Sequence, residues 1–322
     1  MLFSQNQFEI AQDMVYQSIL PTPQYAWPLL KKRLGSDIWV KHENHTPTGA
    51  FKIRGGLVHL GLLKSRGHSG GVISATRGNH GQSLAVAGAQ LGLPVVIVAP
   101  ENNSIEKNAA MRAQGAELIL KGKDFDESAD FARNLASERD LHMVPSFHEE
   151  LCLGVSTYGH ELLTAVPDLH TVYVPIGLGS GICSLITQRD LMGLKTEIVG
   201  VVPENANAYA LSFSAGEVVP VNAVDTFADG TAVRVPNADA LNIITKGAAR
   251  VITVSEDDIA EATRIYYADT HNIAEGAGAV ALAGRISENK KMAGKSTAVI
   301  LSGGNIDLAW FSAILAGETP KN

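Results

Sequence analysis

The chain has 322 residues, of which 45% are hydrophobic and 18% are charged, and its formal net charge is −7 at pH 7. A chain of this length can bury a large core and form two domains. The negative charge comes without any block of basic residues, so the sequence lacks the electrostatic footprint of a nucleic-acid-binding protein. Residues 1–24 lack the basic start and apolar run of a signal peptide, and the longest apolar runs, such as residues 95–99, are far shorter than the ~20 residues of a membrane span.

Cysteine and histidine usage predicts neither a disulfide framework nor a metal centre. The two cysteines, Cys152 and Cys183, are too few to brace a chain of this length, so we expect a protein of the reducing cytoplasm. None of the ten histidines falls in a His-Glu-x-x-His pattern or another spacing typical of metal ligands, and we expect no metal. Segments 148–150 and 160–161, which join histidine to glutamate, are interpreted as solvated polar faces.

The first regular elements lead to one lysine. An alternating run at residues 38–43 predicts a strand, and Pro-Thr-Gly at 47–49 predicts a turn into a helix. Apolar residues recur every three or four positions between residues 53 and 63, which is typical of a helix with one buried face, and Thr48 is its expected N-cap. This spacing places Lys52 in the first helical turn.

Strands and helices then alternate along the chain. In the first series we expect strands at 71–75, 95–99, 117–120 and 142–145 and helices at 82–91, 105–114 and 125–138. In the second series, which an irregular stretch at 216–242 interrupts, we expect strands at 171–174, 196–202, 250–254 and 296–301, helices at 155–165, 182–192, 257–269 and 276–288, and a closing helix around Trp310. Short apolar strands that alternate with helices predict parallel sheets covered on both faces. The expected fold class is α/β, with two doubly wound domains.

Lys52 is the candidate reactive amine. The neighbouring Phe51 and the positive end of a helix both disfavour a charged ammonium, so we expect a lowered pKa for Lys52. A neutral lysine is nucleophilic and can form a Schiff base with a carbonyl compound. The alternative interpretation is that Lys52 and Arg54 lie on the solvated side of a half-buried helix.

Three glycine-containing loops each follow a predicted strand. Residues 74–82 read Ser-Ala-Thr-Arg-Gly-Asn-His-Gly-Gln, residues 177–181 read Gly-Leu-Gly-Ser-Gly, and residues 301–305 read Leu-Ser-Gly-Gly-Asn. The first two loops open helices, where backbone N–H groups and the helix dipole can bind an anion. Taken singly, the first and third are also typical of ordinary turns, and the second would equally suit a dinucleotide.

These loops and residues 48–56, Thr-Gly-Ala-Phe-Lys-Ile-Arg-Gly-Gly, together resemble the signatures of the pyridoxal-phosphate serine/threonine dehydratases. The resemblance implies that Lys52 carries the cofactor, Asn79 contacts its ring oxygen and Ser302 meets its pyridine nitrogen. The expected phosphate cradle consists of Gly177, Leu178, Gly179, Ser180 and Gly181. The expected site for the substrate carboxylate consists of Thr76, Arg77, Gly78 and His80.

Several positions depart from the family's usual pattern. Ala50 stands where the family usually has serine, and Leu178 and Ser180 replace two glycines of a tetraglycine loop, both with their backbone amides intact. Glu275 is expected near the cofactor ring without an assigned role. The serine of the racemases aligns with Arg77, so racemisation is not expected.

The serine racemase branch also has a divalent-cation site. Its two acidic ligands align here with Val202 and Ala208, although Glu204 lies nearby. Neither Val202 nor Ala208 has a side chain that can bind a hard cation. We therefore expect no such site.

The resemblance spans nearly the whole chain and implies a tryptophan synthase β-subunit-like architecture, pyridoxal-phosphate fold type II. In this fold residues 56–148 form a small domain inserted into a large cofactor-binding domain made of residues 1–55 and 149–322. The implied assembly is a homodimer in the cytoplasm. No regulatory domain like that of longer biosynthetic threonine dehydratases is expected, and therefore no feedback by isoleucine.

The implied reaction is β-elimination from a 3-hydroxy L-amino acid, most simply threonine or serine, to a 2-keto acid and ammonia. A bulkier or anionic substrate such as phenylserine or hydroxyaspartate is the alternative. From other classes, a non-catalytic pyridoxal-phosphate-binding module and a nicotinamide dehydrogenase are also considered. The dehydrogenase fits less well, because residues 177–181 do not form a Gly-x-Gly-x-x-Gly motif.

Overall fold

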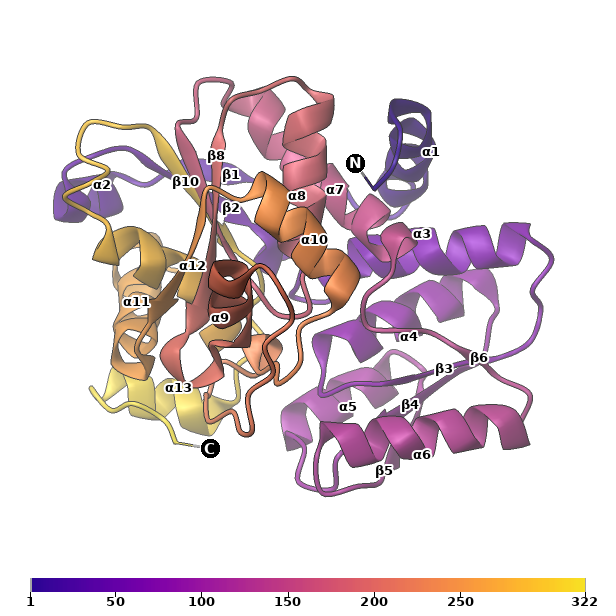
Figure 1. Cartoon of the computed structure of the whole chain (residues 1–322). Helices are drawn as coiled ribbons and strands as arrows, with labels where there is room; N and C mark the ends of the chain where they lie inside the picture. Colours follow the sequence, from indigo (N-terminus) through magenta and orange to yellow (C-terminus); the bar gives the residue numbers. More distant parts are fainter. Residues whose placement is uncertain (1, 322) are drawn as a thin grey trace.

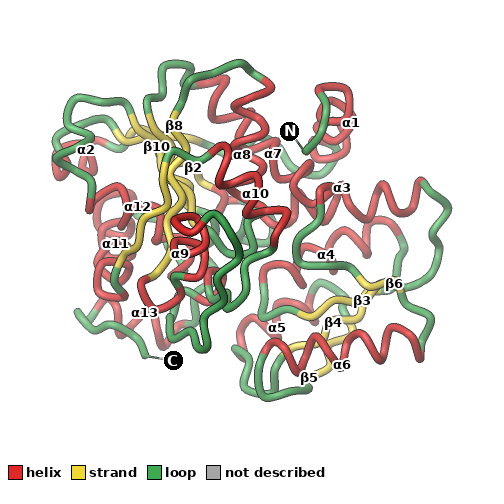
Figure 2. The backbone as a smooth tube through the Cα atoms, in the orientation of Figure 1, coloured by secondary structure: helices red, strands yellow, loops and turns green. Residues whose placement is uncertain are grey.

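The chain folds into two lobes, each built on its own β-sheet between layers of helices (Figure 1). The computed structural model describes residues 2–321. Figure 2 shows the strands as two separate groups, one in each lobe. The predicted α/β class with parallel sheets is confirmed. Among the described residues, no helix has both the length and the hydropathy needed to cross a membrane.

The larger sheet has six strands in the order β1-β2-β10-β7-β8-β9. These strands are β1 (Gln24–Ala26), β2 (Ile38–His42), β7 (Thr171–Pro175), β8 (Glu197–Pro203), β9 (Arg250–Val254) and β10 (Thr297–Leu301). Only β1 and β2 pair antiparallel, and the other neighbours are parallel. Val172 and Ile198 pack into one hydrophobic cluster and Tyr173 and Val199 into another. Because both faces are buried, the strands appear in the sequence as short apolar runs.

Helices cover both faces of the larger sheet. The cluster around Tyr173 and Val199 is completed by helices of one layer, namely α2 (Pro28–Leu34), α11 (Glu256–Thr270), α12 (Gly276–Ser287) and α13 (Leu308–Leu315). The cluster around Val172 and Ile198 is completed by α1 (Gln5–Tyr16), α7 (Glu149–Ala165), α8 (Ser180–Leu191) and α10 (Ala238–Gly247). A short helix, α9 (Ala208–Ala215), packs against β9 and α10.

The smaller sheet has four parallel strands in the order β5-β4-β3-β6. Its strands are β3 (Val72–Ala75), β4 (Val95–Ala99), β5 (Glu117–Leu120) and β6 (His142–Met143). Helices α4 (Asn79–Leu91) and α5 (Ile105–Ala113) lie on one side of the sheet and α6 (Phe125–Glu138) on the other (Figure 1). All four strands fall between residues 56 and 148, while the domain boundaries themselves stay a prediction.

Helix α3 (Lys52–Ser65) connects the lobes, because it packs against α4 of the smaller lobe and α7 of the larger one. The approach to α7 is so close that a Cβ on Gly55 would lie 2.7 Å from the carbonyl oxygen of Leu151. The expectation that Thr48 caps this helix is wrong. The cap position is Phe51, and the Thr48 hydroxyl instead donates to the carbonyl of Ala50 at 3.3 Å within the preceding turn.

A buried charge network lies under α3. Arg54 is fully buried and donates to Glu43 at 2.8 Å and to Glu161 at 2.6 Å, while Lys41 donates to Glu161 at 2.5 Å. The alternative that Arg54 faces solvent is therefore wrong. The interpretation of 148–150 and 160–161 as solvated faces is also wrong for Glu150 and Glu161, which are both buried against cationic side chains, whereas Glu149 is exposed as expected.

Candidate active site

A pocket of about 510 Å³ is lined by residues of both lobes. The first of its walls comes from the start of α3, the second from the β3–α4 loop, and the third from the β7–α8 loop and the end of β10. The two loops and the end of β10 lie at the carboxyl ends of parallel strands, where ligands bind in open α/β sheets. Every predicted site residue lines this pocket, namely Lys52, Thr76, Arg77, Gly78, Asn79, His80, Gly177, Leu178, Gly179, Ser180, Gly181 and Ser302.

Lys52 is the first residue of α3, as predicted, and its amine reaches the pocket. The Nζ atom donates to the Ser180 hydroxyl at 2.9 Å and lies 5.0 Å from the centroid of the Phe51 ring. Burial lowers the pKa of Lys52 to about 8, and no carboxylate contributes to the shift. A lysine with this pKa has a substantial neutral fraction near neutral pH and can act as a nucleophile or a base.

The loop at residues 177–181 forms a cradle at the N-terminus of α8. Its N–H groups from Leu178 to Gly181 make no hydrogen bond to another backbone group of the described chain. Gly179 has φ +105°, a conformation that residues with a Cβ rarely adopt, and a Cβ on Gly177 would lie 2.2 Å from the carbonyl oxygen of Gly230. Free N–H groups at a helix N-terminus are suited to a phosphate group.

A chain of hydrogen bonds fixes Asn79 at the start of α4. Its amide nitrogen donates to Glu275 at 2.6 Å, and its carbonyl oxygen accepts from Asn305 at 2.8 Å. Asn305 in turn donates to the carbonyl of Thr48, just before the lysine helix. Burial raises the pKa of Glu275, although the charge of Lys107 opposes that rise. Glu275 thus orients Asn79, a role that could not be assigned to Glu275 from the sequence.

The β3–α4 loop presents unpaired donors. The Gly78 N–H donates to the Thr76 hydroxyl at 3.2 Å, but no hydrogen bond engages the N–H groups of Arg77, Asn79 or His80 within residues 2–321. The His80 ring is buried, and its Nε2 atom also has no partner in the described structure. Burial and the nearby charge of Lys52 lower the pKa of His80 to about 3, so the ring is neutral. The free N–H groups of this loop can donate hydrogen bonds to a carboxylate or another anion.

Ser302 lies at the end of β10 and is only 5% exposed. Its hydroxyl donates to the carbonyl of Ala277 at 3.3 Å, and its own carbonyl accepts from the Phe51 N–H at 3.0 Å. The side chain therefore offers a neutral polar group opposite the lysine helix. Arg77 also lines the pocket, and its guanidinium makes no ion pair with any described residue.

Sequence reasoning missed an ion pair at the pocket wall. Lys107 of α5 bonds at 3.0 Å to Asp229, the first residue of the short 3₁₀ helix η3 (Asp229–Thr231) that precedes α10. Burial opposes protonation of Lys107, but Asp229 and Glu275 outweigh it and raise its pKa. No motif marks either residue, since Lys107 reads as an ordinary helical residue and Asp229 lies in the stretch expected to be irregular. Asn305 could have been found, because it ends the Ser-Gly-Gly-Asn motif at residues 302–305.

These residues fit pyridoxal phosphate. The amine of Lys52 suits its aldehyde, the free N–H groups of the 177–181 cradle suit its phosphate, and the buried, unpaired nitrogen of His80 shows that the pocket is built to receive a polar ligand. In such a complex Lys52 would hold the cofactor covalently. Asn79 and Ser302 would stand beside its ring.

Comparison with known proteins agrees with this fit. The family model described as "Pyridoxal-phosphate dependent enzyme" matches residues 15–303. The chain is 31% identical to a biosynthetic L-threonine dehydratase of Haemophilus influenzae over 91% of its own length, but it spans only 58% of that protein. It is 29% identical to the L-threo-3-hydroxyaspartate ammonia-lyase of Saccharomyces cerevisiae over 96% of this chain and 95% of that protein.

The fold also matches a solved structure. The processed form of threonine deaminase isoform 2 from Solanum lycopersicum superposes with a TM-score of 0.91 and 31% identity, over 97% of this chain and 93% of that one. The predicted fold type II architecture is thus confirmed, as is the resemblance to the threonine dehydratases. Because the family model covers most of its length, the chain belongs to the family of pyridoxal-phosphate-dependent enzymes.

Proposed function

We propose that the protein is a pyridoxal-phosphate-dependent ammonia-lyase that converts a 3-hydroxy L-amino acid, threonine or serine, to a 2-keto acid and ammonia. One observation carries the proposal. A buried amine with a pKa of about 8 shares a pocket with a free N–H cradle and with a neutral serine, Ser302. The chain spans about half to nearly all of its curated relatives, so the substrate is argued from the pocket as well as from their names.

Lys52 has two roles in this proposal. When bound, pyridoxal phosphate supplies an electron sink for the negative charge that develops on the substrate Cα. Lys52 would hold the cofactor in the resting enzyme, and as a free, neutral amine its Nζ would remove the Cα proton of the substrate. The lowered pKa supports this role, because a base must be neutral before it accepts a proton. The hydrogen bond to the Ser180 hydroxyl keeps Nζ inside the pocket.

The surrounding residues position the substrate and bias the outcome. The unpaired N–H groups of Arg77, Asn79 and His80 in the β3–α4 loop bind the substrate carboxylate, and the cradle at 177–181 binds the phosphate. Ser302 would stand beside the pyridine nitrogen, where its hydroxyl would stabilise a protonated ring less than a carboxylate does. A weaker electron sink favours loss of the β-hydroxyl over transamination.

A second substrate class is favoured by Arg77. Its guanidinium lines the pocket without an ion pair in the described structure and can bind a second carboxylate. The yeast relative of matching length is named for L-threo-3-hydroxyaspartate, an amino acid with such a group. Hydroxyaspartate is therefore the second candidate substrate. Activity on phenylserine tests whether the pocket admits a bulky side chain.

A keto-acid assay tests the proposal. The purified holoenzyme is incubated separately with threonine, serine, threo-3-hydroxyaspartate and phenylserine, and 2-keto acid and ammonia are measured together. We expect equal amounts of the two products from threonine or serine. Bound cofactor without any keto acid would indicate a non-catalytic binding module instead, and a preparation that binds no pyridoxal phosphate would refute the proposal.

The assembly and the compartment belong to the proposal as well. By resemblance to the dehydratases we propose a homodimer that works in the cytoplasm, with a small domain at residues 56–148 inserted between 1–55 and 149–322. Light scattering of the purified holoenzyme measures the assembly directly. A monomeric mass at micromolar concentration would contradict the dimer.

A further inference from the structure

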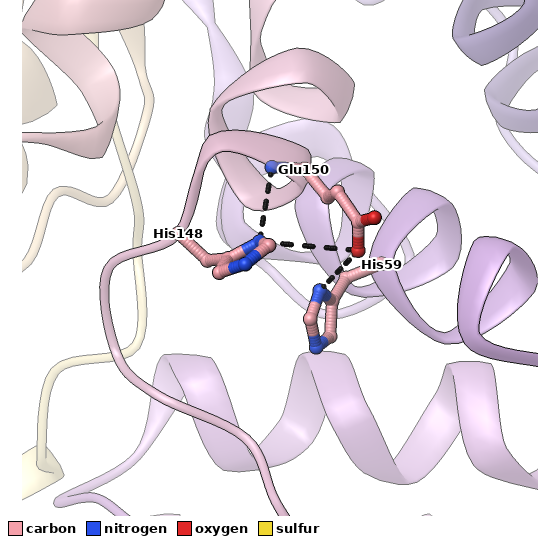
Figure 3. A group of neighbouring side chains, drawn as sticks. All are labelled: His59, His148 and Glu150. Carbon is pink, nitrogen blue, oxygen red and sulfur yellow. Dashed lines mark hydrogen bonds and ion pairs between the residues drawn. The ribbon is translucent and has the colours of Figure 1, made fainter.

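Two histidines and a glutamate, His59, His148 and Glu150, meet where α3 packs against the first turn of α7 (Figure 3), and none of them lines the active-site pocket. His59 Nδ1 lies 2.8 Å and His148 Nδ1 lies 3.8 Å from the same carboxylate oxygen of Glu150. One possible ligand atom from each residue lies within 4.8 Å of the other two. Bonds of about 2.0 to 2.2 Å to a tetrahedral Zn²⁺ place ligand atoms roughly 3.3 to 3.5 Å apart. The three side chains thus need only small movements to share one ion.

The His59 ring is buried beside Glu150. Its side chain is 4% exposed, and neither ring nitrogen meets the geometry of a hydrogen bond to a described residue. Its Nδ1 atom nevertheless lies 2.8 Å from Oε2 of Glu150 in an ion-pair contact. A ring nitrogen and a carboxylate oxygen are thus already held next to each other, as two ligands of one ion must be.

Neighbouring groups orient the carboxylate. Arg66 donates to both carboxylate oxygens of Glu150, to Oε1 and, at 3.3 Å, to Oε2, and Oε2 is also the oxygen that faces the two histidines. The charge of Arg66 opposes a cation, but its side chain is 53% exposed and its field is screened by solvent and salt. The His148 side chain is 40% exposed, so the cluster is open to solvent on that side.

We propose that His59, His148 and Glu150 form a binding site for a divalent transition-metal ion of the Zn²⁺ type. Two imidazoles and one carboxylate are a ligand set that suits Zn²⁺ and leaves a fourth position for water. None of the three residues lines the active-site pocket, and His59 follows Lys52 by seven residues, about 10 Å along α3. The ion would join α3 to α7 between the lobes and stabilise that junction without taking part in the reaction.

The site could not be found from chain spacing. His59 is separated from the other two ligands by the whole of the smaller sheet, and His148 and Glu150 look like an ordinary helix start. His148 does cap α7, because its Nδ1 atom accepts from the Glu150 N–H at 3.2 Å. An ion bound through Nδ1 would replace that hydrogen bond.

Calorimetric titration of the holoenzyme with Zn²⁺, after chelator treatment and dialysis, tests the proposal. We expect one ion per chain and a rise in Tm on binding. In His148→Asn the affinity should fall at least about tenfold, the scale on which metal sites respond even to changes around their ligands. Asparagine is a good helix cap, so this variant removes the imidazole and keeps the start of α7 intact. Glu149→Gln, an exposed neighbour outside the cluster, is the matched control and should bind like the parent.

Two further measurements keep the proposal falsifiable. Co²⁺ added in place of Zn²⁺ should give the intense visible absorbance of tetrahedral coordination in the parent and lose it in His148→Asn. Glu150→Gln should weaken binding as well, and circular dichroism checks that each variant is folded. If the parent binds no Zn²⁺, or if His148→Asn and Glu150→Gln bind it with the parent's affinity, the ion lies elsewhere or nowhere and the proposal is overturned.

Discussion

The buried network under α3 gives a prediction about stability. Glu161 accepts hydrogen bonds from Lys41 at 2.5 Å, from Arg54 at 2.6 and 3.0 Å, and from the Thr22 N–H at 3.2 Å. With Glu43, the network has two cations and two carboxylates and no net charge. Glu161→Gln leaves one buried positive charge without a counterion and turns an amide N–H₂ toward groups that can only donate.

The expected loss follows from this imbalance. Removing one partner of a buried ion pair costs about 3 to 5 kcal/mol, a large share of the roughly 5 to 15 kcal/mol that holds a domain folded. For 322 residues the unfolding entropy is about 0.7 kcal/mol/K. The loss therefore corresponds to a decrease in Tm of roughly 4 to 7 °C. The double variant Lys41→Met, Glu161→Gln restores the charge balance and should lose less than the sum of its two single variants.

The same prediction has a pH dependence. Burial opposes ionisation of Glu161, but the charges of Arg54 and Lys41 outweigh it, so its pKa lies below the ordinary value of 4.5. A carboxylate with a lowered pKa in the folded state stabilises the protein above its unfolded pKa, and this contribution is lost as the pH falls through the folded pKa. The difference in stability between the parent and Glu161→Gln should thus be full at pH 7 and shrink below about pH 4.5.

Thermal and urea unfolding, followed by circular dichroism between pH 3 and 8, measure these differences. Glu138→Gln, which changes an exposed carboxylate at the end of α6, is the control and should stay within about 0.5 kcal/mol of the parent. A Glu161→Gln variant within 1 °C of the parent, or a stability gap that does not change with pH, would refute the network's role.

Two further predictions concern the pocket. Gly177→Ala should raise the Kd for pyridoxal phosphate at least about tenfold, because its Cβ would lie 2.2 Å from the carbonyl oxygen of Gly230 and displace the cradle, in which one charged hydrogen bond is worth about 1.5 to 3 kcal/mol. Fluorescence titration measures this Kd, and Gly70→Ala, a change at an exposed glycine, is the control. An unchanged Kd in Gly177→Ala would contradict the prediction. Arg77→Ala should lower kcat/KM for hydroxyaspartate by about tenfold to a hundredfold more than for threonine, while exposed Arg112→Ala changes neither. Equal losses on both substrates would make Arg77 structural.

Much of the fold could be predicted because its determinants are local. Parallel strands buried on both faces appear as short apolar runs, and the loops at their carboxyl ends are marked by glycines, so both sheets and the pocket loops were expected. The helices α1, α2, α9 and α10 were not predicted, and α10 begins inside the stretch that was expected to be irregular. Helix α1 starts with a polar capping box of Ser4 and Gln7 and buries only Phe8, Ala11 and Val15, a pattern too weak to separate from an irregular arm.

The missing parts depend on residues far apart in the chain. Glu161 looks solvated beside His160, yet its partners Lys41 and Arg54 lie 120 and 107 positions away. Asn79 is held by Asn305, which is 226 positions away. Local spacing carries no information about such pairs, because only the packing of α3 between the lobes brings them together. The lysine could be predicted, but the long-range contacts that orient the residues around its pocket could not.

The central claim is that Lys52 carries pyridoxal phosphate. Reduction of the holoenzyme with borohydride fixes the cofactor to whichever lysine holds it, and mass spectrometry of the digested chain identifies that residue. We predict one pyridoxyl group per chain, on the peptide that contains Lys52, and none on the same peptide of Lys52→Ala. A pyridoxyl group on any other lysine of the native enzyme would contradict the account.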